Sequence, residues 1–377
     1  MPPQSPLPRR VSLGLAPRLE AGLVHVDAVQ EGSSAESSGL AVGDRLVRVG
    51  AIEPVDPDSL AHALRAVALL SSIAVVVERG GQRVELTLER RTAGLEPGPT
   101  ELVTIEVSDD ARLRLRGHLV RAVASDWLVV IVGGLADTPC EILDGSYGAS
   151  FAQFVDTLAR NQVSTLRFDR RGIGDSEGDA TQSSLTDDLS DARAALRFAR
   201  EHHQGNIALF GHSTGAVTAA LAREVSWPHG HATPLAIFGA PADPWFECLR
   251  EGTQRHHVRQ GLPEAEAEAI ANEETTRVAA WAHANGPGTF EARSASWHAE
   301  LATHDPVRLL GTPNRSTLVL DGGRDLAVPR SAAVRLARVC ATQPRVFPEL
   351  DHTMQQNPST RECVVALELI RWLASHA

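Results

Sequence analysis

The chain has 377 residues and a formal net charge of −11, with 43% hydrophobic and 22% charged residues. This composition belongs to a globular protein and not to a disordered one. The chain is longer than a domain with a single hydrophobic core usually is, so two domains are expected. The acidic balance argues against nucleic acid and against an anionic membrane as partners.

Residues 1–10 are rich in proline and are expected to form a flexible N-terminus without the apolar run of a signal peptide. No stretch of 18 apolar residues predicts a transmembrane helix. The four cysteines form no C-x-x-C pair, which favours free thiols in a reducing, cytoplasmic compartment. The histidines show no metal-ligand spacing, so neither a metal nor another cofactor is expected.

Residues 11–89 predict a small β-rich module with one clear helix, which is expected to start at Pro57-Asp58. Strands are predicted where apolar and polar residues alternate, and Gly80-Gly81 predicts a hairpin between the last two of them. These strands span 23–29, 44–49, 73–77 and 84–88, and the apolar face of the helix consists of Leu60, Leu64, Val67 and Leu70.

Two stretches of this module carry a family resemblance: Ser12-Leu13-Gly14-Leu15 and the sequence GSSAESSGLAVGDRLVRVG at 32–50. They resemble a PDZ domain of the kind attached to bacterial high-temperature-requirement proteases. The resemblance implies that the loop of Leu13, Gly14 and Leu15 receives the carboxylate of a peptide C-terminus, while the peptide adds a strand to the sheet edge. The alternative is a PDZ-like fold that only packs on its neighbour.

After a linker at 90–100, strands and helices alternate from 101 to 377, which predicts a mostly parallel sheet with helices on both faces. Between about 242 and 310 the alternation stops, and two helical patterns there predict an inserted helical cap. The predicted strands are 101–107, 113–120, 127–132, 163–168, 207–210, 235–238, 316–320 and 345–350; the predicted helices are 150–160, 185–200, one ending near 224, 330–340 and 360–374.

The sequence Gly211-His212-Ser213-Thr214-Gly215 lies between a predicted strand and an alanine-rich helix. Glycines two residues before and two after the serine remove Cβ atoms that would clash in a sharp strand-to-helix turn. The serine Oγ is then presented beside a helix N-terminus, which favours negative charge. Because the motif is short, a plain turn before a helix is the alternative. Ser213 is the candidate nucleophile.

A serine nucleophile needs a general base, and that base needs an orienting carboxylate. Both are expected after later strands, because active sites of open α/β sheets lie at the carboxyl ends of strands. Strand 316–320 runs into a loop with Asp321 and Asp325, and strand 345–350 runs into Asp351-His352-Thr353. The chain therefore has an acid and then a histidine after the serine, in the order that this architecture requires.

Over 101–377 these motifs are similar to those of the α/β-hydrolase superfamily. The G-x-x-D-x-x-V motif of that superfamily matches Gly322, Asp325 and Val328, which implies Asp325 as the acid, with Asp321 as the alternative. The Asp-His-Thr motif of the superfamily implies His352 as the base. The alternative is that His352 is a surface histidine without a catalytic role. The stretch 169–176 matches the D-x-R-G-x-G-x-S turn and is expected to be structural.

The oxyanion of the reaction needs hydrogen-bond donors where its charge develops. The residue after the nucleophile supplies one backbone N–H, here Thr214, and the loop after strand 127–132 supplies the other. That loop reads Gly133-Gly134-Leu135, where the superfamily commonly reads His-Gly-x. By position the second donor is Leu135, with Gly134 next.

The loop 133–142, Tyr147 and the helix 150–160 resemble bacterial carboxylesterases of the serine-aminopeptidase-like subgroup. The resemblance implies a serine esterase that cleaves small acyl esters through an acyl-enzyme on Ser213. Aromatic residues in the cap suggest an apolar acyl or aryl group, although a cap also needs them for its own core. A peptidase, aminopeptidase or thioesterase with the same triad is one alternative, and a non-catalytic PDZ adaptor is another.

Overall fold

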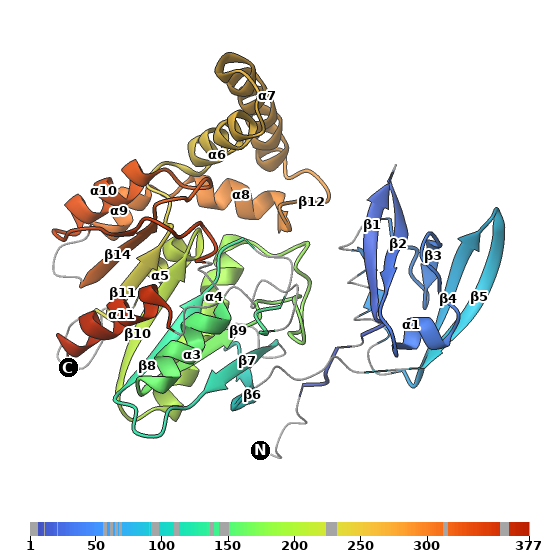
Figure 1. Ribbon diagram of the computed structural model, residues 1–377, viewed down its shortest axis with the longest axis horizontal. Coiled ribbons are helices and arrows are strands. Elements are labelled where there is room, and N and C mark those ends of the chain that lie inside the picture. Colours follow the sequence, from blue (N-terminus) through green and yellow to red (C-terminus); the bar gives the residue numbers. More distant parts are fainter. Residues whose placement is uncertain are drawn as a thin grey trace. The chain divides into compact units, whose positions relative to one another are not determined.

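The structure is a computed structural model that divides into two compact units, Met1–Leu95 and Glu96–Ala377, each described here by itself (Figure 1). The expected helix start at Pro57-Asp58 and Tyr147 lie outside the described residues. The described residues are 7–10, 12–20, 22–55, 59–60, 63–64, 67, 70–89, 91, 98–108, 113–135, 139–142, 151–223, 232–311, 316–354 and 362–376.

The first unit is an antiparallel sheet of five strands in the order β1-β2-β3-β4-β5, so β1 is an edge strand. The hairpin predicted at Gly80-Gly81 is confirmed, because Arg79 pairs with Gln82 and both glycines have positive φ. The elements are β1 (Leu15–Glu20), β2 (Leu23–Val29), α1 (Ser34–Ser37), β3 (Arg45–Val49), β4 (Ser72–Arg79) and β5 (Gln82–Glu89).

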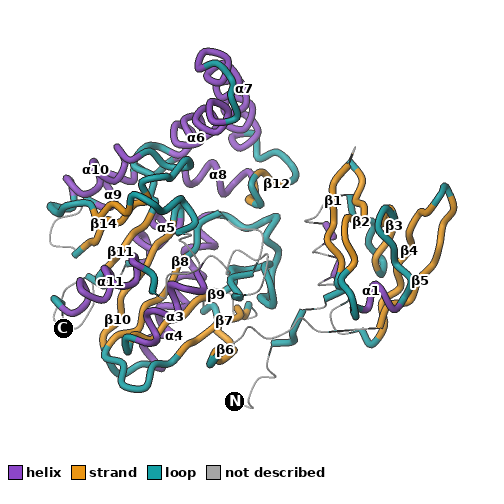
Figure 2. The backbone as a smooth tube through the Cα atoms, viewed as in Figure 1, coloured by secondary structure: helices purple, strands orange, loops and turns teal. Residues whose placement is uncertain are grey.

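The second unit is built on an eight-stranded sheet in the order β15-β14-β11-β10-β8-β9-β7-β6 (Figure 2). Strands β15, β14, β11, β10, β8 and β9 run parallel to one another. Strand β7 pairs antiparallel with β9, and β6 pairs antiparallel with β7. The mostly parallel sheet predicted from the sequence is confirmed. The strands are β6 (Thr100–Glu106), β7 (Arg114–Val120), β8 (Trp127–Val132), β9 (Val163–Phe168), β10 (Asn206–His212), β11 (Leu235–Phe238), β14 (Thr317–Gly322) and β15 (Arg345–Phe347).

Helices cover both faces of this sheet, which explains why strands such as β8 are apolar throughout. Leu128 and Val130 belong to a core with α4, α5 and α10, whereas Val129 and Ile131 belong to a core with α3 and α11. These helices are α3 (Ala152–Arg160), α4 (Leu185–His202), α5 (Gly215–Ala222), α10 (Arg330–Val339) and α11 (Val364–Ala374).

The segment between β11 and β14 contains more structure than the two helical patterns predicted for it. It forms α6 (Trp245–Arg259), α7 (Glu264–His283), the short hairpin β12 (Thr289–Phe290) and β13 (Arg293–Ser294), α8 (Ala295–Ala302) and α9 (Pro306–Leu310). Two of these helices are too short for a clear helical period: α8 has eight residues and buries Ala295, Trp297, His298 and Leu301, and α9 is a single turn that Asp305 caps. No helix in the described part of the chain is long and apolar enough to cross a membrane.

Two predicted elements are shorter in the structure. Strand β15 ends at Phe347 because proline follows, which cannot donate to a strand ladder. Helix α11 begins at Val364 and not at 360, after the N-cap Cys363, whose N–H donates to Thr157 Oγ1 at 2.8 Å. All four cysteines have free thiols, as predicted.

Candidate active site

The turn at Ser213 joins the end of β10 to the start of α5, and Ser213 itself has a left-handed backbone with φ of 56°. The flanking glycines are required by close backbone contacts. A Cβ on Gly211 would lie 2.5 Å from Ala216 Cα, and one on Gly215 would lie 2.4 Å from the carbonyl oxygens of Val132 and Gly133. Strain of this kind in a non-glycine residue is typical of functional sites.

The acid and the base predicted from the sequence lie together. His352 Nδ1 is 2.7 Å from Asp325 Oδ2, and the Asp325 side chain is 1% exposed. The spacing of the G-x-x-D-x-x-V motif has a local cause, because Val328 N–H donates to Asp325 Oδ1 at 2.9 Å. Gly322 lets the loop before the histidine approach: a Cβ there would lie 2.7 Å from the Leu350 carbonyl oxygen.

Asp321, the alternative acid, lies in β14 and is 1% exposed, and among the described residues its side chain makes no hydrogen bond to His352. Burial, together with the negative charge of Asp325, raises the pKa of Asp321 to about 7. A carboxyl group that holds its proton near neutral pH is poorly suited to stabilise an imidazolium. The arrangement therefore favours Asp325 over Asp321 as the partner of the histidine.

Replacing Asp321 by asparagine is expected to increase stability most at alkaline pH. Because an unfolded aspartate has a pKa of about 3.9, the folded state binds one more proton than the unfolded state between pH about 4 and about 7. The stability that Asp321 contributes is thus complete below pH about 4 and lost as the pH rises through 7. The gain in Tm of D321N over the parent protein should grow across this range and then level off.

Thermal unfolding at a series of pH values measures this difference, with D156N as the control. Asp156 is a half-exposed carboxylate on α3 whose side chain is 48% exposed in an ion pair with Arg160. A D321N gain that is equal at all pH values would contradict the assignment of the raised pKa.

His212, the residue before the nucleophile, anchors the loop of the base. Its Nε2 donates to the backbone carbonyl of His352 at 2.7 Å, and its ring packs against Phe151 and Phe238 at centroid distances of 5.5 and 6.1 Å. Burial, with the nearby His352, lowers the pKa of His212 to about 3, so the ring is neutral. A neutral ring with its proton on Nε2 fits this hydrogen bond.

Replacing His212 by phenylalanine is expected to lower the free energy of unfolding by about 1 kcal/mol, because the partly buried His352 carbonyl loses its donor. The H212F variant keeps an aromatic ring between Phe151 and Phe238. The control is H212Q, whose terminal amide offers a donor and should recover part of the loss. Denaturant unfolding measures both; equal stability of H212F and the parent protein would show that the bond contributes nothing.

The two backbone donors predicted for an oxyanion line the same cavity as Ser213. Thr214 is the N-cap of α5, and Leu135 follows β8. In the part of the chain that the structure describes, neither backbone N–H donates a hydrogen bond. Gly134 lies against the nucleophile, since a Cβ there would be 2.7 Å from Ser213 Cβ.

A cavity of about 860 Å³ connects these groups with the segment between β11 and β14. Ser213, His352 and both N–H carriers, Leu135 and Thr214, line it, although no hydrogen bond from Ser213 Oγ is recorded among the described residues. The other side of the cavity is contributed by α6, α7 and the β12 region, including Trp245, Leu249, His256, His257, Glu274 and Phe290. A small organic molecule fits a cavity of this size.

The turn that matches D-x-R-G-x-G-x-S braces its neighbours. Arg171 bonds Asp191 of α4 at 2.7 Å, and Asp175 pairs with the buried Arg116 at 3.2 Å. Ser176 Oγ donates to the Asp169 carbonyl at 2.7 Å. These contacts support the structural role expected for this turn.

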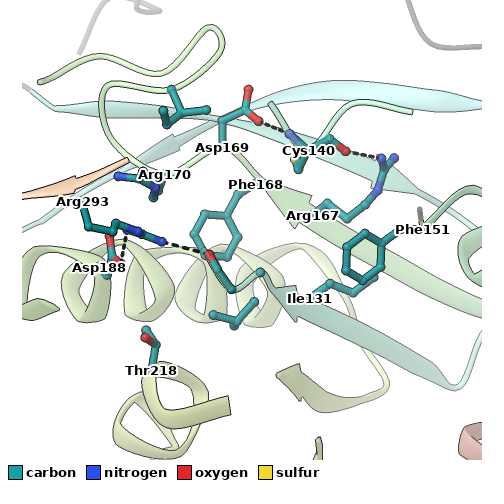
Figure 3. A pocket seen from close by; sticks show the side chains of 14 residues that line it. Ile131, Cys140, Phe151, Arg167, Phe168, Asp169, Arg170, Asp188, Thr218 and Arg293 are labelled. Atoms are coloured by element: carbon teal, nitrogen blue, oxygen red, sulfur yellow. Dashed lines mark hydrogen bonds and ion pairs between the residues drawn. The ribbon is translucent and has the colours of Figure 1, made fainter. Parts of the chain in front are cut away.

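One group of described residues brings three metal-ligand types together: the ligand atoms of His118, Cys140 and Asp169 lie within 4.8 Å of one another. Cys140 N–H donates to Asp169 Oδ1 at 2.7 Å, and Arg167 Nη1 donates to the Cys140 carbonyl at 2.8 Å (Figure 3). Burial alone would raise the pKa of Asp169, but His118 and the hydrogen bonds from Cys140 lower it. The carboxylate is thus stabilised by protein partners, and we treat the group as a brace.

Gly239, at the end of β11, is a site residue that the sequence analysis missed. Its φ is +57°, and a Cβ there would lie 3.0 Å from both Asp325 Oδ2 and His352 Nδ1. The glycine therefore leaves room for the acid–base pair. The sequence shows a glycine directly after a short apolar strand, which could have marked it as a candidate site residue. The sequence does not show that this glycine contacts loops far along the chain.

The predicted carboxylate loop of the first unit borders a groove of about 490 Å³. Leu13, Gly14 and Leu15 line the groove together with the edge strand β1 and with Leu60 and Leu64. Two backbone hydrogen bonds fix the loop: the Leu13 carbonyl accepts from Ala35 N–H at 2.9 Å, and the Gly14 carbonyl accepts from Gln30 N–H at 2.7 Å.

Together, the sheet, the turn at Ser213 and the acid–base pair define an α/β hydrolase. The family model described as "Serine aminopeptidase, S33" matches residues 126–359, all within the second unit. The chain belongs to this family. No protein among the curated sequences matches it.

Solved structures similar to this chain include three esterases. Est1E from Butyrivibrio proteoclasticus with ferulic acid bound is 15% identical, with 72% of this chain and 98% of that chain covered and a TM-score of 0.49. A Pyrococcus furiosus esterase is 16% identical (73% and 91% covered, TM-score 0.49). The esterase domain of a Rhodothermus marinus protein is 17% identical (74% and 99% covered, TM-score 0.47).

Proposed function

We propose that the protein is a serine hydrolase that cleaves carboxylic esters, with Ser213 as nucleophile, His352 as general base and Asp325 as the orienting acid. The observation that carries the proposal is the 2.7 Å contact between His352 Nδ1 and Asp325 Oδ2, with His352 and the strained Ser213 lining one cavity. Membership of a hydrolase family supports it.

In the proposed reaction, Ser213 Oγ attacks the acyl carbon while its proton passes to His352 Nε2, the ring nitrogen that Asp325 does not engage. The Leu135 and Thr214 N–H groups stabilise the oxyanion of the tetrahedral intermediate. The alcohol leaves with the proton from His352, and an acyl-enzyme remains. Water, deprotonated by the same histidine, then attacks the acyl carbon and releases the acid and free Ser213.

The absence of a recorded Ser213–His352 hydrogen bond does not oppose this mechanism. Catalytic hydrogen bonds are often long or poorly aligned without substrate and tighten in the complex. The lining of the cavity by Trp245, Leu249 and Phe290 favours an apolar acyl or aryl group. A peptidase, aminopeptidase or thioesterase would use the same three residues, and a cytoplasmic small-molecule ester is our preferred substrate.

Labelling with a fluorophosphonate probe tests the proposal, since such probes react with activated serines. The parent protein should take one label and S213A none. S176A is the matched control, because Ser176 Oγ is buried and donates to the Asp169 carbonyl, and it should label like the parent. An unlabelled parent protein would refute catalysis and favour a non-catalytic adaptor. A panel of esters, thioesters and aminoacyl amides then separates the enzyme classes by kcat/KM.

We further propose that the first unit is PDZ-like and binds a peptide C-terminus at Leu13, Gly14 and Leu15. The groove of about 490 Å³ beside the edge strand β1 supports this, because strand addition needs an open edge. Gly14 cannot carry a side chain without strain, since its φ is +73° and a Cβ would lie 2.1 Å from Ser33 Cβ. A C-terminal peptide library should give binders that G14A weakens and G22A, at φ +75° in open space, does not. A library without binders would leave the first unit a packing module.

A further inference from the structure

The carbonyl of Gly134 and the N–H of Leu135 belong to one planar peptide group, in which the two bonds of a trans peptide point in opposite directions. Gly134 lines a small cavity of about 60 Å³ together with Arg293 and Asp188. Leu135 lines the large cavity of the candidate active site. A carbonyl that is held on the side of the small cavity therefore directs the Leu135 N–H toward the other side.

Arg293 supplies a donor for this carbonyl. Its Nη2 donates to the Gly134 oxygen at 3.0 Å, and its Nη1 is 2.5 Å from Asp188 Oδ2 (Figure 3). Trp297 Nε1 donates to the same carboxylate oxygen at 2.8 Å, and the guanidinium carbon lies 4.7 Å from the centre of the Trp297 ring. The Arg293 side chain is only 3% exposed, so its position is fixed from several sides.

The parts of this arrangement come from distant segments of the chain. Asp188 lies on α4, Arg293 on β13 and Trp297 on α8, whereas Gly134 follows β8. The backbone before Arg293 is itself restrained, because the Ala292 carbonyl accepts from Arg170 Nη2 at 2.9 Å. Through Arg293, the segment between β11 and β14 thus contacts the loop that carries an oxyanion donor.

We propose that Arg293 is a positioning residue that sets the orientation of the Gly134–Leu135 peptide and so points the Leu135 N–H into the oxyanion hole. The inference rests on the proposed function. Without the guanidinium, the Gly134 carbonyl loses a charged donor, and the freedom of glycine allows the peptide to rotate. A rotated peptide would present its oxygen, and not its N–H, to the developing negative charge.

The test compares R293M with R171M, and uses p-nitrophenyl acetate as the substrate. Arg171 is the matched control: it is a largely buried arginine that pairs with Asp187 and Asp191 of the same α4, without a contact to Gly134. Both variants should lower Tm. R293M should lower kcat about 10²-fold, the effect of losing one oxyanion donor, with KM little changed, whereas R171M should keep the parent kcat.

A trifluoromethyl ketone provides a readout that a general loss of stability would not move, because its adduct with a serine places an oxyanion in the hole. Its affinity should fall in R293M by about the same factor as kcat. R293K keeps the positive charge beside Asp188 but cannot fork to two acceptors, so its kcat should lie between those of R293M and the parent. If R293M does not fold, the kcat of R293K is compared with that of the parent protein instead.

The outcomes separate the two proposals. A parent protein that neither hydrolyses esters nor takes the fluorophosphonate label would overturn the proposed function, whatever the variants do. An active parent with R293M and R171M reduced equally in kcat, or with R293M unreduced, would overturn the role of Arg293 alone. A KM effect without a kcat effect would likewise contradict it, since it would indicate substrate binding and not oxyanion stabilisation.

Discussion

Replacing Asp325 by asparagine is expected to lower kcat for ester hydrolysis about 10⁴-fold, the size of effect seen when an orienting aspartate is lost. The Asp325 carboxylate accepts from His352 Nδ1 at 2.7 Å and so keeps the proton off Nε2. An asparagine can donate to Nδ1 instead, which favours the tautomer with its proton on Nε2. That tautomer cannot take the proton of Ser213, although the shape of the site is retained.

The same exchange at Asp321 provides the control for this prediction. Asp321 is buried and precedes Asp325 by four residues, but burial and the charge of Asp325 raise its pKa to about 7, so it is partly protonated at neutral pH. D321N should therefore keep kcat within about threefold of the parent, since asparagine replaces a carboxyl group that is already about half protonated at pH 7. Steady-state kinetics at pH 7 compares the two. If D321N loses activity and D325N keeps it, the acid assignment is wrong.

The sequence predicted those parts of the site that depend on local backbone geometry. The turn at Ser213 is encoded by Gly211 and Gly215, whose missing Cβ atoms are visible in the sequence as a five-residue motif. The spacing around Asp325 is equally local, because Val328 N–H bonds its carboxylate three residues away. Apolar strands such as β8 predicted a sheet covered on both faces because no face of such a strand suits water.

The parts that the sequence did not predict depend on contacts between distant segments. His212 donates to His352, which is 140 residues away, and Arg293 contacts Gly134 across 159 residues. The periodicity of apolar residues along a sequence contains no information on such long-range side-chain contacts. The helices α8 and α9 were missed for another reason: with eight and five residues, they are too short to show a helical period.

Replacing Gly239 by alanine is expected to lower kcat by less than the roughly 10²-fold that a displacement of about 1 Å in a catalytic group costs, because the acid–base pair must shift by only a few tenths of an ångström. A methyl group at this position would lie 3.0 Å from Asp325 Oδ2 and from His352 Nδ1, closer than such contacts normally allow. Because the two side chains are bonded to each other, moving either of them lengthens the bond between them.

The backbone strain of this exchange must be separated from the crowding of the acid–base pair. Gly80 provides the control, since its φ of +56° matches the +57° of Gly239, while a Cβ there would meet nothing within 4 Å. Both G239A and G80A should lose about 1–2 kcal/mol of stability from a left-handed alanine. Only G239A should lose kcat, because only there does the new methyl group contact the acid and the base. Equal kcat values in the two variants would mean that the pair tolerates displacement, and its 2.7 Å bond would then not limit catalysis.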